Sequence, residues 1–159
     1  DVSLEFSLCS PVVTLNGADV TDEIRSERVS LASSKIAKYS LVRKRLVDFQ
    51  RKFSRGHGLI ADGRDMGSVI FPSADLKIFL TASVKVRANR RYKELIARGE
   101  NVSLRDLERR IALRDKGDRE RKVSPLIAGE GAIVIDASEM SVNEVKKEII
   151  HYFDLIPSV

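Results

Sequence analysis

The sequence has one cysteine, two histidines, no tryptophan and only 6% aromatic residues among its 159 positions. Cys9 cannot form an internal disulfide, so we expect a reducing, cytoplasmic environment and treat Cys9 as a packed strand residue. His57 and His151 have no metal-ligand spacing with Cys9 or with each other, so we expect no metal site made by this chain. Because aromatic residues do not interleave with the basic clusters, a stacking platform for single-stranded nucleic acid has little support.

Long apolar runs are also missing. The longest, residues 78–80 and 132–135, fall far short of the roughly 20 residues that a membrane-spanning helix needs, so we expect no contact with a membrane. The first residues alternate acidic and apolar side chains instead of showing a basic cluster followed by an apolar stretch, which argues against a signal peptide. The composition, 43% hydrophobic and 32% charged, is typical of one soluble globular domain.

The charge is biased towards positive. A formal net charge of +5 and a pI of about 9.5 indicate an anionic partner, but they do not separate a nucleic acid from a nucleotide. Basic residues concentrate in residues 87–91 and 105–122, and carboxylates are set among them. Those carboxylates disfavour a nucleic-acid-binding module. A steep loss of affinity with salt would reveal such a module.

The first third of the sequence predicts short strands followed by two helices. Alternation over residues 2–8 and the apolar run 12–15 predict two antiparallel strands, and Asn16-Gly17 predicts a tight turn. A third short strand is expected near Val20. From Ile24 to Phe53 the apolar residues recur at helical spacing, which predicts two helices with a break near residues 39–40.

The rest alternates strands and helices. We expect core strands at residues 59–61, 76–80 and 132–136. Helices are expected over 84–98, after Ser103, and after Ser141, where a Ser-x-x-Glu box reaches Glu144. This order predicts a parallel sheet with right-handed crossovers, preceded by a mixed β/α insertion.

Residues 62–67 form the first candidate site. Asp62 directly follows a predicted core strand, and Arg64 and Asp65 come next between Gly63 and Gly67, at the end of a strand where open α/β sheets place their ligands. The planar guanidinium of Arg64 suits phosphate oxygens. The spacing alone equally allows a tight turn in which the arginine and the aspartates neutralise one another.

Residues 114–122 form the second candidate site. On a helix, Arg114, Asp118 and Arg121 occupy positions i, i+4 and i+7 and project from one face. That face could bind a ribose hydroxyl through Asp118 and phosphates through the arginines. The pattern alone favours a solvated helix with many salt bridges. Gly117 weakens the helix and indicates a mobile segment.

Both stretches together resemble bacterial cytidylate kinases, and the similarity covers essentially the whole chain. The segments that carry it are residues 16–25, 32–35, 42–43, 60–67 with Phe71-Pro72, and 114–126. The resemblance implies an α/β, three-layer, parallel-sheet P-loop kinase fold. Residues 1–55 would be a small β/α insertion that binds the acceptor nucleotide. Residues 56–159 would be the remainder of the kinase core, with a helical lid at about 110–126.

The resemblance also implies roles for single residues. Ser34, Arg43 and Asp65 would line the cytosine pocket, and Arg64 and Arg121 would hold the CMP phosphate. Arg114 and Asp118 would contact the sugar. Arg64, Arg114 and Arg121 would also neutralise charge during phosphoryl transfer. Further candidates for contacts with ATP phosphates are Arg119, Arg87, Arg90 and Arg91.

The sequence departs from that family in one respect: the phosphate-binding pattern Gly-x-x-x-x-Gly-Lys-Ser/Thr is missing. We expect ATP and Mg²⁺ to be held mainly by an N-terminal segment that this sequence lacks. The intact protein is expected to be a cytoplasmic, monomeric kinase that phosphorylates CMP and also dCMP, and the 159 residues alone are expected to be inactive. An alternative is a non-catalytic chain that binds CMP without using ATP.

Overall fold

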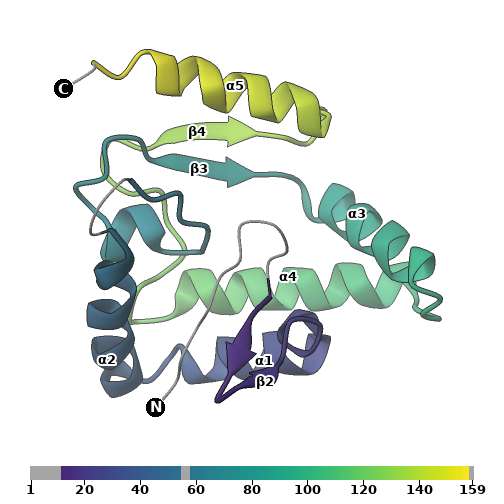
Figure 1. Ribbon diagram of the computed structural model, residues 1–159. Coiled ribbons are helices and arrows are strands. Elements are labelled where there is room, and N and C mark those ends of the chain that lie inside the picture. The colour runs from purple at the N-terminus through teal and green to yellow at the C-terminus, as the bar shows by residue number, and fades with distance from the viewer. Residues whose placement is uncertain (1–11, 55–57, 158–159) are drawn as a thin grey trace. The chain divides into compact units, whose positions relative to one another are not determined.

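The computed structural model describes residues 12–54 and 58–157 (Figure 1). The chain divides into two compact units, Asp1–Arg43 and Lys44–Val159, and each is described by itself. The strand predicted over residues 2–8 lies outside the described residues, as does Cys9.

The first unit contains a β-hairpin. Strand β1 (Thr14–Leu15) pairs antiparallel with β2 (Ala18–Asp19). Asn16 and Gly17 connect them with φ angles of 52° and 81°, the positive values that a two-residue hairpin turn of this kind requires. The predicted turn is therefore confirmed.

Helices follow the hairpin. A short 3₁₀ helix, η1 (Glu23–Arg25), leads into α1 (Glu27–Ile36), where the side chain of Ser26 accepts a hydrogen bond of 3.3 Å from the Val29 amide. Helix α2 (Ser40–Arg51) comes next and continues into η2 (Lys52–Ser54). The predicted break between two helices near residues 39–40 is confirmed.

The second unit has a parallel pair of strands. Strand β3 (Ile78–Thr81) pairs with β4 (Ile133–Asp136), in a register that places Ile78 beside Ile133 and Thr81 beside Asp136 (Figure 1). The helices α3 (Val84–Ala97) and α4 (Leu104–Glu120) lie between these strands in the chain, and α5 (Val142–Asp154) follows β4. Parallel strands need such a long connection. The predicted parallel pairing of these two strands is confirmed.

Side-chain caps define where these helices begin. The hydroxyl of Ser103 accepts a hydrogen bond from the Asp106 amide at the start of α4. Ser141 and Glu144 form a reciprocal capping box at the start of α5. Each cap satisfies amide groups that a helix N-terminus leaves unpaired, and both predicted starts are confirmed.

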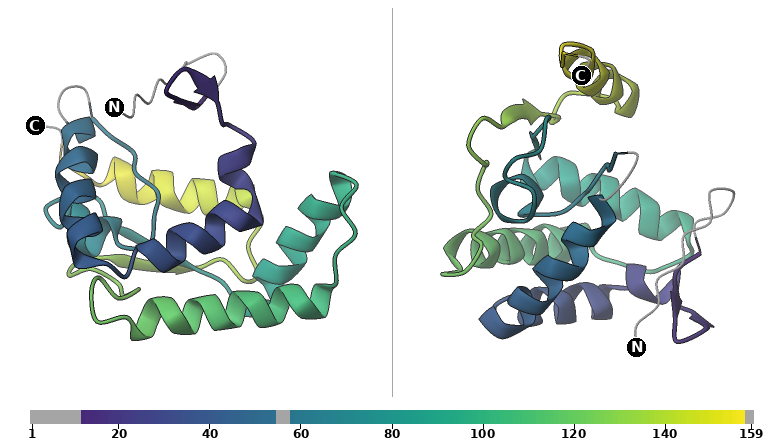
Figure 2. Two further views of the ribbon diagram at one scale, coloured as in Figure 1. Left: turned by 90° about the horizontal axis from the view of Figure 1, so that it is seen from below. Right: turned by 60° about the vertical axis from the view of Figure 1, so that its left-hand side comes forward.

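The best-packed apolar cluster joins α3 to α4. Ala88, Leu95 and Leu107 are buried there, and partly buried apolar side chains from the same two helices and their connection surround them. Figure 2 shows α3 turning sharply into α4. This cluster anchors the N-terminal half of α4, and the same helix continues to the charged residues of the second candidate site.

One predicted strand is wrong. Residues 59–61 form no strand, and the side chain of Ile60 is fully exposed. A strand is stabilised by hydrogen bonds to a neighbour, and among the described residues β3 pairs only with β4. The segment instead enters a one-turn π-helix, η3 (Met66–Ile70), in which the amides of Val69 and Ile70 both bond to the carbonyl oxygen of Asp65.

A membrane-spanning helix would need both length and a low content of charged residues. In the ranges 12–54 and 58–157, no helix meets both conditions.

Candidate functional site

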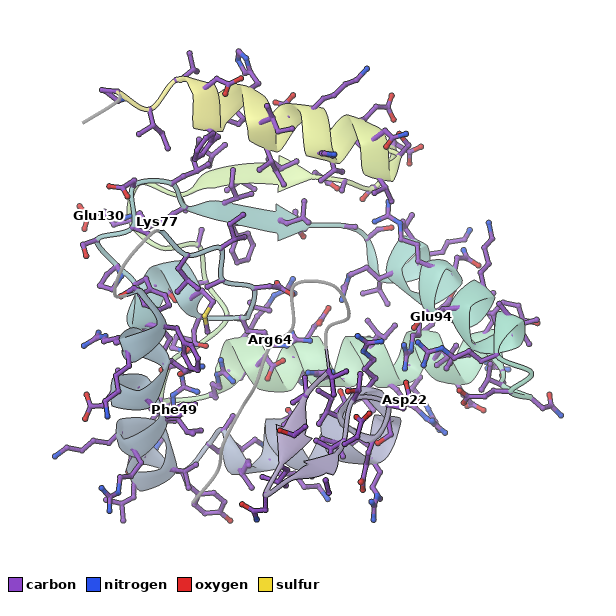
Figure 3. The ribbon with its side chains drawn as sticks, viewed as in Figure 1. Asp22, Phe49, Arg64, Lys77, Glu94 and Glu130 are labelled. Atoms are coloured by element: carbon purple, nitrogen blue, oxygen red, sulfur yellow. The ribbon has the colours of Figure 1, made fainter. Side chains whose placement is uncertain are left out.

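The site begins with the loop that leads into η3. Asp65 is buried, and its carbonyl oxygen accepts hydrogen bonds from two amides of the η3 turn at 2.9 and 3.1 Å. The side chain of Arg64, one residue earlier, is 33% exposed and lies over α4 (Figure 3). The partly exposed guanidinium of Arg64 therefore comes directly before Asp65, whose backbone is fixed by these two hydrogen bonds.

Asp118 is the carboxylate that receives this guanidinium. Its side chain is only 4% exposed and lies 2.8 Å from Nη1 of Arg64. Arg114 Nε lies 3.8 Å away and Arg121 Nη1 lies 3.5 Å away. A buried carboxylate needs such compensation, because burial without a counter-charge is strongly unfavourable. The structure thus brings together three of the arginines that the sequence analysis selected.

Asp115, one turn earlier on α4, is a second buried carboxylate. Arg87 of α3 pairs with both of its oxygens, one of them at 3.1 Å, and Arg64 Nη1 lies 3.7 Å away. The cluster formed by these ion pairs contains four arginines and two aspartates, so it carries a formal excess of two positive charges. An excess of this size favours a ligand with negative charge.

Arg121 does not belong to helix α4, contrary to the prediction. It was predicted to project from the helix with Asp118, but α4 ends at Glu120 and Arg121 is extended, with φ −67° and ψ 137°. Its Nε donates to the carbonyl oxygen of Ser124, which curls the side chain back towards Asp118. This side chain is only 6% exposed, and within the described part of the chain its buried Nη2 has no hydrogen-bond partner. A buried donor of this kind needs a polar partner.

Gly117 was expected to weaken the helix, yet α4 continues through it to Glu120. The tertiary ion pairs of Asp115 and Asp118, on either side of it, stabilise this turn and outweigh the low helix propensity of glycine.

The electrostatic environment of Arg114 reflects the concentration of positive charge. Burial lowers the pKa of Arg114, and the neighbouring charge of Arg64 lowers it further, while Asp118 and Asp115 act in the opposite direction. An anion that binds between Arg64 and Arg114 reduces the repulsion between their two positive charges.

A cavity of about 320 Å³ opens beside the cluster. The loop and π-turn of residues 61–68 line one side of it, and residues 77–81, which include β3, line another. Arg87, Asp115 and the exposed Arg119 contribute the charged part of the lining from α3 and α4. Arg119 therefore lies at the cavity, and its contact with ATP phosphates stays a prediction.

Ser34 and Arg43 belong to the first unit. Ser34 is half-buried on α1, and Arg43, in the first turn of α2, directs Nη1 to the carbonyl oxygen of Ala37 at 3.5 Å. Their place in a base pocket stays a prediction.

The other two arginines of α3 have local partners. Arg90 donates to the carbonyl oxygens of Ala137 and Met140, just beyond β4, and Arg91 pairs with Glu94. Contacts of these arginines with ATP also stay a prediction.

Sequence reasoning missed Asp115. A signal was present, since Leu104, Leu107 and Ile111 form an apolar stripe whose next positions are Asp115 and Asp118. A carboxylate that continues an apolar stripe is buried and therefore needs a partner.

Arg51, at the end of α2, was also missed. It donates to the carbonyl oxygens of Ile70 and Val69 at 2.8 and 3.1 Å, and so supports η3 from outside. No sequence pattern links residues so far apart.

The residues present do not fit a complete site for ATP and Mg²⁺. In the described part of the chain no three acidic, histidine or cysteine side chains gather as metal ligands. The sequence also has no glycine-rich loop ending in Gly-Lys-Ser/Thr.

The fold and the cluster together define a class. Arg87 also donates to the carbonyl oxygen of Ala82, directly after β3, so the arginines gather at the carboxyl end of a parallel strand. That is where open α/β proteins bind ligands, and the excess positive charge makes this an α/β protein with a candidate anion-binding site.

Comparison with known proteins identifies the family. The family described as cytidylate kinase matches residues 1–155. The cytidylate kinase of Nitrosococcus oceani is 47% identical over 138 residues, which are 87% of this chain and 61% of the relative. That of Dichelobacter nodosus is 43% identical over 97% of this chain and 72% of its own length. That of Methylococcus capsulatus is 50% identical over 84% of this chain and 60% of its own length. The chain therefore belongs to the cytidylate kinase family, and it spans about 60% to 72% of the length of these relatives.

Proposed function

We propose that the full-length protein carrying this chain transfers the γ-phosphate of ATP to CMP, and also to dCMP. The observation that carries the proposal is the buried Nη2 of Arg121, which has no hydrogen-bond partner in the described residues and lies in a cluster with two excess positive charges. The phosphate of an acceptor nucleotide has the negative charge and the oxygen atoms to accept a hydrogen bond from this Nη2 and to balance the cluster.

The family supports roles for single side chains. Arg64 and Arg121 bind the phosphate of CMP, and Arg114 with Asp118 binds the sugar, where the carboxylate accepts a hydrogen bond from a hydroxyl. Ser34, Arg43 and Asp65 bind the cytosine. Arg119, exposed at the cavity, reaches ATP phosphates when the lid closes.

The protein contributes mainly alignment and electrostatic stabilisation, because phosphoryl transfer needs little covalent catalysis. Arg64, Arg114 and Arg121 orient the acceptor phosphate and reduce the repulsion between it and the incoming phosphoryl group. Partial burial strengthens these interactions relative to water. ATP and Mg²⁺ supply the transferred group and its charge neutralisation when they bind.

The family supports a finer assignment of the fold and organisation. The protein has the three-layer P-loop kinase fold, with residues 1–55 as the acceptor-binding insertion, residues 56–159 as the remainder of the core, and a lid at about 110–126. It acts as a monomer in the cytoplasm, on free nucleotides and not on nucleic acid.

Arg121→Ala in the full-length protein tests this function. A coupled assay with ATP should show turnover of CMP and dCMP by the wild type and a loss of about a hundredfold or more in the variant, since one transition-state donor is removed. Arg98→Ala removes an exposed ion pair with Glu94 and serves as the control, with unchanged turnover. CMP binding by a wild type that transfers no phosphate would favour the alternative, a non-catalytic nucleotide-binding protein.

A further inference from the structure

Asp115 lies within ion-pair distance of two arginines, Arg87 and Arg64. Both of its oxygens are taken by Arg87, Oδ1 at 3.1 Å from Nη1 and Oδ2 in close contact with Nη2. Arg64 Nη1 approaches the same carboxylate only to 3.7 Å. The bidentate geometry is the stronger form of this interaction, so Arg87 is the main partner of Asp115.

The orientation of Arg87 is set independently of Asp115. Its Nε donates to the carbonyl oxygen of Ala82 at 2.9 Å, and Ala82, directly after β3, is buried. All three guanidinium nitrogens of Arg87 are therefore engaged by the protein itself. This distinguishes Arg87 from Arg64, whose two ion pairs in the described residues both use Nη1.

Removing Arg87 would change the balance around Arg64. Asp115 is 5% exposed, so it would stay buried with a charge and no bidentate partner. An uncompensated buried carboxylate draws the nearest cation, because leaving it unpaired is costly. That cation is Arg64, and its guanidinium would turn towards Asp115, which leaves it less available to a ligand in the cavity.

We propose that Arg87 is a positioning residue that occupies Asp115 and thereby keeps Arg64 available for the acceptor phosphate. This inference rests on the proposed function only for the identity of the ligand. The ion pairs that carry it lie within the second unit and do not depend on where ATP binds. Arg87 then acts through Arg64 and does not itself contact the nucleotide.

A double-mutant cycle in the full-length protein tests the proposal. It compares Arg87→Gln, Asp115→Asn and the double variant, which remove the two charges singly and together. Arg87→Gln should raise the KM for CMP about tenfold, because a charge-assisted phosphate contact is weakened. Asp115→Asn should leave the KM for CMP unchanged or lower it, because the competitor of Arg64 loses its charge. The double variant should return to within about twofold of the wild type, the non-additivity expected of residues in one network.

The KM for CMP separates positioning from a merely structural role. If Arg87 only stabilises the fold, Arg87→Gln will lower the melting temperature and leave the KM for CMP unchanged, and the proposal is overturned. If Arg87→Gln raises the KM for ATP and leaves that for CMP unchanged, Arg87 is a direct ATP contact, and the proposal is overturned as well. Arg87→Lys keeps the charge but not the bidentate geometry, and should fall between wild type and Arg87→Gln.

Arg98→Gln is the matched control. Arg98 caps α3 and pairs with the carboxylate of Glu94 at 2.6 Å, but this pair is exposed and lies outside the cluster. The substitution should leave the KM for CMP unchanged. If the wild type proves not to phosphorylate CMP, the proposed function fails. The cycle is then measured by calorimetric titration of inorganic pyrophosphate, and the same rescue in its Kd supports the positioning role, while its absence overturns it.

Discussion

The Cα of Gly129 lies against the backbone of Gly67, so that a Cβ built on Gly129 would be 2.5 Å from the Gly67 carbonyl oxygen. Such a distance is far inside van der Waals contact, and backbone atoms cannot swing aside as a side chain can. The segment between α4 and β4 is therefore packed directly against η3, the turn that follows Arg64 and Asp65.

Gly129→Ala should accordingly lower the free energy of unfolding by about 1–3 kcal/mol, the usual penalty for overpacking a well-packed position. Gly117→Ala is a matched control, because nothing lies within 4 Å of its added Cβ and the residue is in a helix. It should stabilise by about 0.5–1 kcal/mol. Urea unfolding of the full-length variants measures both. Equal effects of the two substitutions would contradict the close packing at Gly129.

Arg64→Ala should impair turnover far more than stability. Losing one phosphate contact in a water-poor site costs about 3 kcal/mol, which corresponds to about a hundredfold in rate. The fold should persist because Asp118 keeps Arg114 and Arg121 as partners. Steady-state kinetics and thermal melting of the full-length protein test this. Normal CMP phosphorylation with a collapsed melting temperature would assign Arg64 to structure.

The choice of base should follow from Ser34, Arg43 and Asp65. These side chains combine donors with an acceptor, and a site built for one polar edge rejects bases that leave its groups unpaired. AMP and GMP should therefore be poor acceptors in comparison with CMP. The measurement is kcat/KM for each nucleotide with the full-length protein. Equal values for CMP and AMP would refute the assignment and indicate a general nucleotide kinase.

The capping box of α5 should make stability depend on acidic pH. Hydrogen bonds from Ser141, backbone and side chain, hold the pKa of Glu144 below its ordinary value of 4.5. Because the folded pKa is lowered, the stabilisation is complete above the unfolded value and is lost as pH falls through the folded one. Glu144→Gln should reduce the slope of melting temperature against pH below about pH 4.5 and leave the slope near neutral pH unchanged. Identical slopes would contradict this.

The 159 residues produced alone should transfer no phosphate, because they include no phosphate-cradling loop for ATP. They should also self-associate. Ile60 is fully exposed, Leu80 is 53% exposed, and Val134 is 60% exposed, and exposed apolar surface next to open strand edges promotes aggregation. Size-exclusion chromatography and a CMP kinase assay on a sample of verified mass test both parts. A monodisperse chain with kinase activity would contradict the prediction.

Local structure could be predicted from the sequence because its causes are local. The Asn16-Gly17 turn depends on the backbone freedom of two residues. The starts of α4 and α5 depend on Ser103 and Ser141 bonding to amides three residues away. The alternation of strands and helices predicted that β3 and β4 run parallel. In each case the interacting groups are neighbours in the sequence or follow a short period.

The failed strand at residues 59–61 shows the limit of that reasoning. Its apolar run satisfies the pattern of a buried strand, but a strand exists only when another strand offers hydrogen bonds. In the described residues that neighbour is not present, and Ile60 is exposed.

For the candidate site, the sequence by itself determined which side chains were available: Arg64, Arg114, Asp118 and Arg121 could be selected from residue types and helical spacing. Only the tertiary structure decided that Arg64 meets Asp118 at 2.8 Å and that Arg87 occupies Asp115. The physical reason is that the free energy of a buried ion pair depends on distance and on exclusion of water. The short distance and the exclusion of water arise only when distant segments pack together. Arg87 and Asp115 are 28 positions apart in the chain, and Arg64 and Asp118 are 54 positions apart.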